Sequence, residues 1–437
     1  MPAALANLLR SLRSRNYRLF FAGQLISLTG TWLTQVATSW LVYRLTHSTV
    51  MLGVVSFAGQ IPAFALSPVA GVLVDRWNLH RTLIATQTLA MLQSFALAIL
   101  TLTHTIHISH ILALYVLQGL INAVDIPARQ AFLVQMVENR DDLANAIALN
   151  SSMFNAARLI GPSLAGVIIA ATNEGICFLA DGISYFFVIL ALFAMSLTRP
   201  PRTTQPHNHV LHDLKDGLKY AIDFPPIRVS LTLVAIMSLV GAPYTVLMPV
   251  FATDILRGGP ATLGFLTAAS GTGALAGGIL LASRKTIVGL GKWIAAASVG
   301  FGAGLIGFAF SRTLVLSMPM MFITGFCMIT SMASINTIIQ TIVEDRMRGR
   351  IMSLFTMCFM GMMPFGALIA GFLARPSRLG PTYTLTLGGV ACIASGAIFL
   401  LKLPTLRHAV RPVLVAKGIL PQVATALESA STVRAPE

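Results

Sequence analysis

The sequence predicts an all-α integral membrane protein, in which twelve transmembrane helices form two pseudo-symmetric six-helix bundles. Of its 437 residues, 55% are hydrophobic and only 10% are charged. The mean hydropathy is +0.78. Soluble domains carry about 25% charged residues, and a soluble protein this apolar could not cover its surface with polar groups. Long apolar runs recur along the whole chain, and a short repeat divides it into two halves.

Each apolar run is long enough to cross a bilayer as a helix, for which roughly twenty residues suffice. Apolar residues lie all round these runs, whereas strands of a membrane barrel are about ten residues long and alternate in polarity. The runs therefore predict helices. The predicted spans are residues 19–42, 51–74, 82–103, 109–133, 145–171, 176–197, 229–252, 261–282, 292–310, 315–342, 351–374 and 382–401.

The longest polar stretch between spans, residues 198–228, separates six spans from six. Its first part is rich in proline, arginine and threonine, as linkers are. Its second part has apolar residues at helical spacing and predicts a short amphipathic helix on the membrane surface. The other predicted units are a cytoplasmic segment 1–18, an N-terminal bundle 19–197, a C-terminal bundle 229–401 and a disordered cytoplasmic tail 402–437.

An internal repeat supports this division. The sequence VENR at 137–140 recurs as VEDR at 343–346, and GPSLAG at 161–166 recurs loosely as GALIAG at 366–371. Parallel repeats of this kind predict a binding site between the two halves, near the middle of the membrane.

The basic residues predict the orientation, since cytoplasmic loops carry an excess of lysine and arginine. Of the 30 such residues, 24 fall on the side that carries both predicted termini and 5 on the other, with Arg158 inside a span. Both termini should therefore be cytoplasmic. The net charge of +15 follows from this asymmetry, so we expect the lipid bilayer and not nucleic acid as partner.

Nothing in the sequence predicts an enzyme, a cofactor or a metal site. The four cysteines lack close spacing, so they indicate neither a disulfide framework nor metal binding. The loop histidines His104, His107 and His110 have no supporting carboxylate or cysteine nearby in sequence. Phosphate-binding GxxxxGK[ST] and Ser-His-Asp patterns are both missing from the chain.

A short charged turn, GVLVDRWNLHR at 71–81, lies between the second and third predicted spans. It resembles motif A of the major facilitator superfamily, a loop of the gating machinery. The resemblance implies that Gly71, Asp75, Arg76 and Arg81 form a latch. In this latch Asp75 would cap a helix N-terminus of the other half, where the helix dipole favours an anion, and so stabilise the outward-facing state. A plain positively charged loop is the alternative.

The turn departs from the usual motif A at Asn78, which replaces glycine, and at Leu79, which replaces a basic residue. Asn tolerates left-handed backbone angles, so the turn can form.

Four further passages extend the resemblance over both halves. They are WLVYRLTHS at 40–48, DIPARQAF at 125–132, NSSMFN at 150–155 with Arg158 and Gly161-Pro162, and RGRIMS at 348–353. Together they resemble one branch of that superfamily, the transmembrane secretion effector group, which includes enterobactin exporters and macrolide-efflux proteins. This resemblance implies the inner membrane of a bacterium.

Three ionisable residues within spans are candidates for proton coupling: Asp125, Arg158 and Asp181. A charge at a span centre costs about 2.5–3.5 kcal/mol, so Arg158 should face the bundle interior with a partner. The candidate partners are Asp125 and Asp181, and Asp125 can pair with Arg158 because their spans are consecutive. Asp125 is predicted either as a proton carrier or as the carboxylate that completes the latch with Arg81, with neither role as a third alternative. Asp181 lies nearer the outer end of its span, and it is predicted either as a coupling residue or as an acid at a helix end.

Gly161, Pro162 and Gly166 resemble motif C of antiporters, which implies export. A kinked packing face of small residues is the alternative. Trp32 and Gln35 belong to a polar and aromatic stripe that either lines a central cavity or faces the membrane interface.

We therefore expect a secondary active transporter that acts as a monomer. It would export a small amphipathic molecule, such as a drug or siderophore, by proton antiport and alternating access. Two alternatives remain. An importer of a polar solute would carry more charge within the C-terminal spans. A non-transporting scaffold or receptor would have no reason to keep Asp125 and Arg158 buried.

Overall fold

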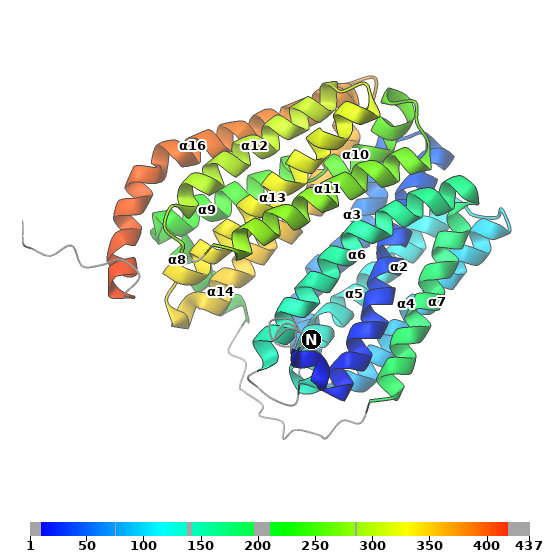
Figure 1. The fold of residues 1–437 in the computed structure, drawn as a ribbon, viewed down its shortest axis with the longest axis horizontal. Helices are drawn as coiled ribbons and strands as arrows, with labels where there is room; N and C mark the ends of the chain where they lie inside the picture. Colours follow the sequence, from blue (N-terminus) through cyan, green and yellow to red (C-terminus); the bar gives the residue numbers. More distant parts are fainter. Residues whose placement is uncertain (1–9, 75, 138–141, 196–209, 285, 418–437) are drawn as a thin grey trace, which may run out of the picture.

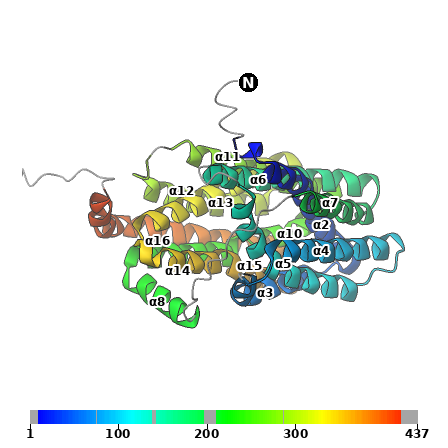
Figure 2. The same ribbon diagram turned by 90° about the horizontal axis from the view of Figure 1, so that it is seen from below.

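A computed structural model of the chain describes residues 10–74, 76–137, 142–195, 210–284 and 286–417. All regular elements in these ranges are helices, and they pack as two bundles side by side (Figures 1 and 2). Eleven of the described helical segments are long and apolar enough to cross a membrane. The first predicted span corresponds to α2 (Arg15–Thr46). It is not among those eleven, and polar side chains such as Gln24, Ser27 and Thr38 lie on its buried face.

The N-terminal bundle contains six long helices. After α2, the long helices are α3 (Thr49–Val74), α4 (Leu79–Leu102), α5 (Ile108–Met136), α6 (Leu143–Ala171) and α7 (Glu174–Phe193). α2 packs against α6 and α7, α3 packs against α5, and α4 packs against α5 and α7. A short 3-10 turn, η1 (Arg10–Arg13), precedes α2.

The C-terminal bundle repeats this pattern, although two of its spans are broken into segments. The seventh span consists of α9 (Pro225–Ile236), η3 (Met237–Gly241), α10 (Tyr244–Val250) and η4 (Phe251–Ile255). The eleventh consists of α14 (Asp345–Thr356), η5 (Met357–Gly361) and α15 (Met362–Leu373). The remaining spans are α11 (Pro260–Ala282), α12 (Leu290–Phe310), α13 (Leu314–Ile342) and α16 (Gly380–Ala416).

The breaks in the seventh span are π-helical turns, which sequence periodicity does not reveal. The backbone N–H of Ala242 donates to the carbonyl of Met237 at 2.9 Å, and that of Leu256 to Phe251 at 2.9 Å. Both bonds span five residues, as in a π-bulge. Pro243 and Pro249 lie between them and donate no backbone hydrogen bond of their own.

The helix pairings show the pseudo-symmetry that the repeat predicts. The contacts of α11 with α13 and of α12 with α13 and α16 correspond to those of α3 with α5 and of α4 with α5 and α7. Between the bundles, α6 packs against α11 and α15 packs against α3. These two contacts are also equivalent, because α6 and α15 are the fifth helices of their halves.

The prediction of a disordered tail from residue 402 is wrong for residues 402–416, because α16 continues as a helix to Ala416. The apolar run that predicts a membrane span ends near Leu401. Helix formation, however, does not require apolar residues on all sides. Residues 418–437 of the predicted tail lie outside the described residues. In the predicted linker, α8 (Val210–Asp223) lies where a short amphipathic helix was expected, and it packs against α14.

Candidate functional site

The two bundles meet at two glycine crossings, which we define as Gly166 with Gly264 and Gly53 with Gly371. A Cβ atom on Gly166 would lie 2.9 Å from the Cα of Gly264, and one on Gly371 would lie 3.1 Å from the Cα of Gly53. The first distance is too short for a side chain and the second is unusually tight for one, so glycine lets the backbones approach this closely. Two of these glycines, Gly166 and Gly371, close the GPSLAG and GALIAG repeats.

Both crossings lie toward the same end of the molecule. We call the end where α2 begins and α16 ends the terminal face, and the other end the opposite face. The crossings join the last turns of α6 and α15 to the first turns of α11 and α3, all at the opposite face. Toward the terminal face the ribbons of α6 and α11 separate (Figure 1). The structure therefore shows one state, in which the halves are in contact at the opposite face.

Polar contacts at the same end hold the halves together. The Tyr43 hydroxyl donates a short hydrogen bond to the Asp254 carboxylate, joining α2 to η4. The Thr49 hydroxyl donates to the carbonyl of Gly371 at 2.8 Å. Sequence reasoning missed Tyr43, Thr49 and Asp254 as contacts between the halves. Asp254, a carboxylate at the end of an apolar span, was the one signal that could have indicated them.

Replacing Gly264 with valine should drive the protein out of this state. Over-packing typically costs about 1–3 kcal/mol, and here the crossing can relieve the clash only by opening. Nitroxide labels at Thr172→Cys and Ser377→Cys, in a cysteine-free background, should report longer distances at the opposite face. Gly278→Val on the same helix is the matched control, because a Cβ there has Ile329 as its nearest neighbour at 4.0 Å. Equal distance distributions for the two variants would contradict this role of the crossing.

Asp125 is buried in the N-terminal bundle, and both of its carboxylate oxygens have partners. Thr86 and Gln87 of α4 each donate to its Oδ1 at 2.8 Å. Arg129, one turn along α5, forms an ion pair with Oδ2. Among the described residues Asp125 pairs with neither Arg158 nor Arg81, so the Asp125–Arg158 pair considered from sequence does not form in this state.

Asp181 is also buried, 1% exposed, but it has a different set of partners. Thr34 of α2 and Ser94 of α4 donate to Oδ2, both at 2.8 Å, and Ser184 lies 3.5 Å from Oδ1. No described cation forms an ion pair with it. Asp181 therefore sits inside the packing of α2, α4 and α7, and the interpretation as a helix-end acid is wrong.

Tyr185 of α7 is another buried polar residue in this bundle. It lies within electrostatic range of both Asp181 and Asp125. Buried carboxylates thus occur in the interior of the N-terminal bundle. The described interior of the C-terminal bundle contains hydroxyl pairs instead, such as Ser298 with Ser331 at 3.0 Å.

Arg158 lies midway along α6, beside the packing of α6 on α2 and α11. Its guanidinium lies 5.8 Å from the ring centroid of Trp32, in cation–π geometry. The ring of Phe154 also contacts Trp32, edge to face with the centroids 5.9 Å apart. No described carboxylate forms an ion pair with Arg158, so its predicted acidic partner is replaced by an aromatic ring.

The remaining candidate residues on α2 and α6 lie near Arg158 and Trp32. Gln35, one turn from Trp32, is exposed. A Cβ on Gly161 would lie 2.4 Å from the Cβ of Trp32, so Gly161 allows α2 and α6 to pack closely. The carbonyl of Pro162 faces Gly264, 2.8 Å from its Cβ position. Gly161, Pro162 and Gly166 therefore pack α6 onto both α2 and α11.

The motif A turn is described only in part, because Asp75 lies outside the described residues. Gly71 has no neighbour within 4 Å of its Cβ position, and Arg76 and Arg81 are exposed. The Asn78 side chain caps α4 by accepting from the backbone N–H of Arg81 at 3.2 Å. Asn78 thus serves as an N-cap, a position that asparagine favours. The latch stays a prediction, as it concerns a state other than this one.

Comparison with known proteins agrees with this architecture. The model of the transmembrane secretion effector family matches residues 6–431. The staphyloferrin A transporter of Staphylococcus aureus is 27% identical over 87% of this chain and 94% of its own length. The multidrug efflux pump Tap of Mycolicibacterium fortuitum is 25% identical over 88% and 95%. The enterobactin exporter EntS of Escherichia coli is 24% identical over 90% and 92%.

Solved structures share the fold at lower identity. The peptide transporter POT in complex with alafosfalin superposes with a TM-score of 0.72, at 12% identity over 91% of this chain and 96% of the other. A bacterial homologue of the lysosomal transporter Spinster, in an inward-facing and occupied conformation, gives 0.68 at 14% identity over 94% and 98%. The chain therefore belongs to the transmembrane secretion effector family, and it is a multi-pass membrane transporter of the major facilitator superfamily rather than an enzyme.

Proposed function

We propose that this transporter exports a small amphipathic molecule from the cytoplasm in exchange for protons. Relatives that match nearly their whole length are named for staphyloferrin A transport, enterobactin export and multidrug efflux. These names support a siderophore or a drug as cargo. The excess of lysine and arginine at the terminal face supports a cytoplasmic location for both termini.

The main support for proton coupling is the environment of the Asp181 side chain. Its carboxylate is buried and accepts hydrogen bonds from hydroxyl groups only, so it can take up a proton without releasing a bound cation. Protonation of Asp125, by contrast, would break its ion pair with Arg129. Ionisable residues inside a membrane protein mark proton relays by default. We assign Asp181 as the proton carrier and Asp125 as the anchor of Arg129.

The cargo would bind where Arg158 and Trp32 lie, between the bundles and near the middle of the membrane. Sites in transporters built from repeats are expected there. A guanidinium with aromatic rings and without a carboxylate partner favours a cargo that carries negative charge on an aromatic or apolar body. Thr34 binds Asp181 and lies two residues from Trp32 on α2, which gives a short physical link between cargo and proton sites.

Alternating access would then follow from rocking of the halves about the middle of the membrane. The glycine crossings and the Tyr43–Asp254 contact close the opposite face in the state described here. The motif A latch, with Asp75, Arg76 and Arg81, would hold the terminal face closed in the alternate state. Each half moves largely as a rigid body, because its helices pack mainly with one another.

Inverted membrane vesicles that carry a pH gradient test this proposal. A catechol siderophore and an anionic fluorescent dye are the cargoes, with a cationic dye for comparison. Cargo addition should dissipate the gradient in vesicles that contain the protein and not in empty ones. Cargo uptake without proton movement would contradict the antiport. If neither a cargo nor a proton moved across a broad panel, the scaffold alternative would be favoured.

A further inference from the structure

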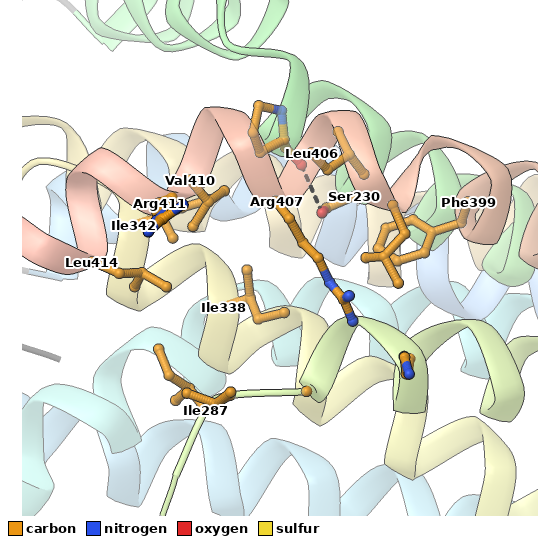
Figure 3. A pocket seen from close by; sticks show the side chains of 16 residues that line it. Ser230, Ile287, Ile338, Ile342, Phe399, Leu406, Arg407, Val410, Arg411 and Leu414 are labelled. Atoms are coloured by element: carbon orange, nitrogen blue, oxygen red, sulfur yellow. Dashed lines mark hydrogen bonds between the residues drawn. The ribbon is translucent and has the colours of Figure 1, made fainter. Parts of the chain in front are cut away.

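A second candidate site lies in the C-terminal bundle, away from the contact between the halves. It is a cavity of about 450 Å³ at the terminal face, between α9, the start of α12, the end of α13 and the last part of α16 (Figure 3). Its walls are mostly apolar. They include Ile338, Ile342, Phe399, Leu403, Leu406 and Leu414.

Three cations line the rim of this apolar cavity. Arg407 and Arg411 lie one turn apart on α16, and Lys292 lies in the first turn of α12. All three are exposed, and none of them forms an ion pair with a carboxylate in the part of the chain that the structure describes. Figure 3 shows the Arg407 side chain extending across the cavity. An apolar cavity with three unneutralised charges at its mouth is suited to an amphipathic anion.

The wall of the cavity is built by the part of α16 that continues beyond the predicted span. Pro404 and Pro412 lie within this part, and the helix changes direction along it (Figure 1), as prolines inside a helix cause. Lys417 then fixes the extension to the end of α13, donating to the carbonyls of Thr341 at 2.8 Å and Val343 at 3.3 Å. The extension is thus docked on the bundle.

The site also lies at the terminal-face ends of the membrane-spanning helices, where lipid headgroups are expected. α12 begins at Leu290 and α13 ends at Ile342, so the cavity occupies the last turns of the spans. Basic residues at this level attract anionic lipids. Most of the lining residues lie on helices, whose backbone groups are already paired and cannot bind a peptide strand, and transported cargo is expected between the bundles.

We propose that this cavity binds one anionic phospholipid from the leaflet at the terminal face. An acyl chain would lie among Phe399, Ile338 and Leu406, and the phosphate would lie between Lys292 and the two arginines of α16. This site is independent of the proposed cargo and proton sites, and its test does not depend on transport.

Native mass spectrometry of the full-length protein from detergent tests the proposal, with phosphatidylglycerol and phosphatidylcholine as probes. Wild type should retain one phosphatidylglycerol under conditions that strip phosphatidylcholine. The triple variant Lys292→Gln/Arg407→Gln/Arg411→Gln should bind phosphatidylglycerol at least about ten-fold more weakly, since each cation near an anionic lipid contributes to the attraction. The matched control is Lys219→Gln/Arg346→Gln/Lys402→Gln, which removes three exposed cations outside the cavity.

Three results would overturn the proposal. The first is equal retention of the two lipids by wild type, which would indicate an unspecific apolar groove. The second is equal loss of phosphatidylglycerol in the triple variant and its control, which would indicate only the overall charge of the face. The third is a gain of lipid on deletion of residues 418–437, which would show that this segment of the chain occupies the cavity instead. An unchanged melting temperature of the triple variant in detergent separates lost binding from lost folding.

Discussion

Asp181→Asn should abolish proton exchange while leaving the protein folded and able to exchange cargo down its gradient. Asparagine has nearly the shape of aspartate and still accepts hydrogen bonds from Thr34 and Ser94, but it cannot take up a proton. Cargo-driven dissipation of a pH gradient in inverted vesicles should therefore fall to the level of empty vesicles. Exchange of labelled for unlabelled cargo, which needs no net proton movement, should continue.

Asp125→Asn is the informative comparison for this prediction. It leaves Arg129 without its carboxylate inside the bundle, and breaking a buried pair typically costs about 3–5 kcal/mol. We expect a lower unfolding temperature, and the double variant Asp125→Asn/Arg129→Gln should recover part of it. If Asp125→Asn remained stable and lost proton exchange, whereas Asp181→Asn kept it, the assignment of the two carboxylates would have to be reversed.

Arg158→Gln should weaken transport of anionic cargo at least ten-fold, measured as the concentration for half-maximal uptake, which corresponds to about 1.4 kcal/mol. The guanidinium is the one described cation midway along a span that has an aromatic partner and no carboxylate. Arg158→Lys keeps the charge but loses the flat stacking surface over Trp32, so its effect should be smaller. A neutral cargo should be affected little by either change.

Arg158 was also a candidate for proton coupling, and the same assay distinguishes the two roles. A binding residue changes the half-maximal concentration and leaves the ratio of protons to cargo unchanged. If Arg158→Gln kept its affinity for anionic cargo and lost proton exchange, Arg158 would belong to the coupling machinery. The proposal of an anionic cargo would then lose its main support.

The sequence alone determined the class of the molecule. Composition and the length of the apolar runs predicted a helical membrane protein, and the GPSLAG and GALIAG repeats predicted two equivalent halves. These features are local or periodic, and they follow from the energy of placing each segment in lipid. The motif resemblances predicted the family, which the match over residues 6–431 confirms.

Only the tertiary structure decided which polar groups meet. From the sequence, Asp125 and Arg158 were near in chain order, yet Asp125 pairs with Arg129 and Arg158 stacks on Trp32. Asp181 meets Thr34 across 147 positions and Tyr43 meets Asp254 across 211. Such pairs depend on helix rotation and on where glycines permit close approach, and neither is encoded in the hydropathy of a single segment. The helical end of α16 escaped prediction for a related reason, since it lies beyond the apolar run of its span and its apolar side faces the cavity beside α9 and α13.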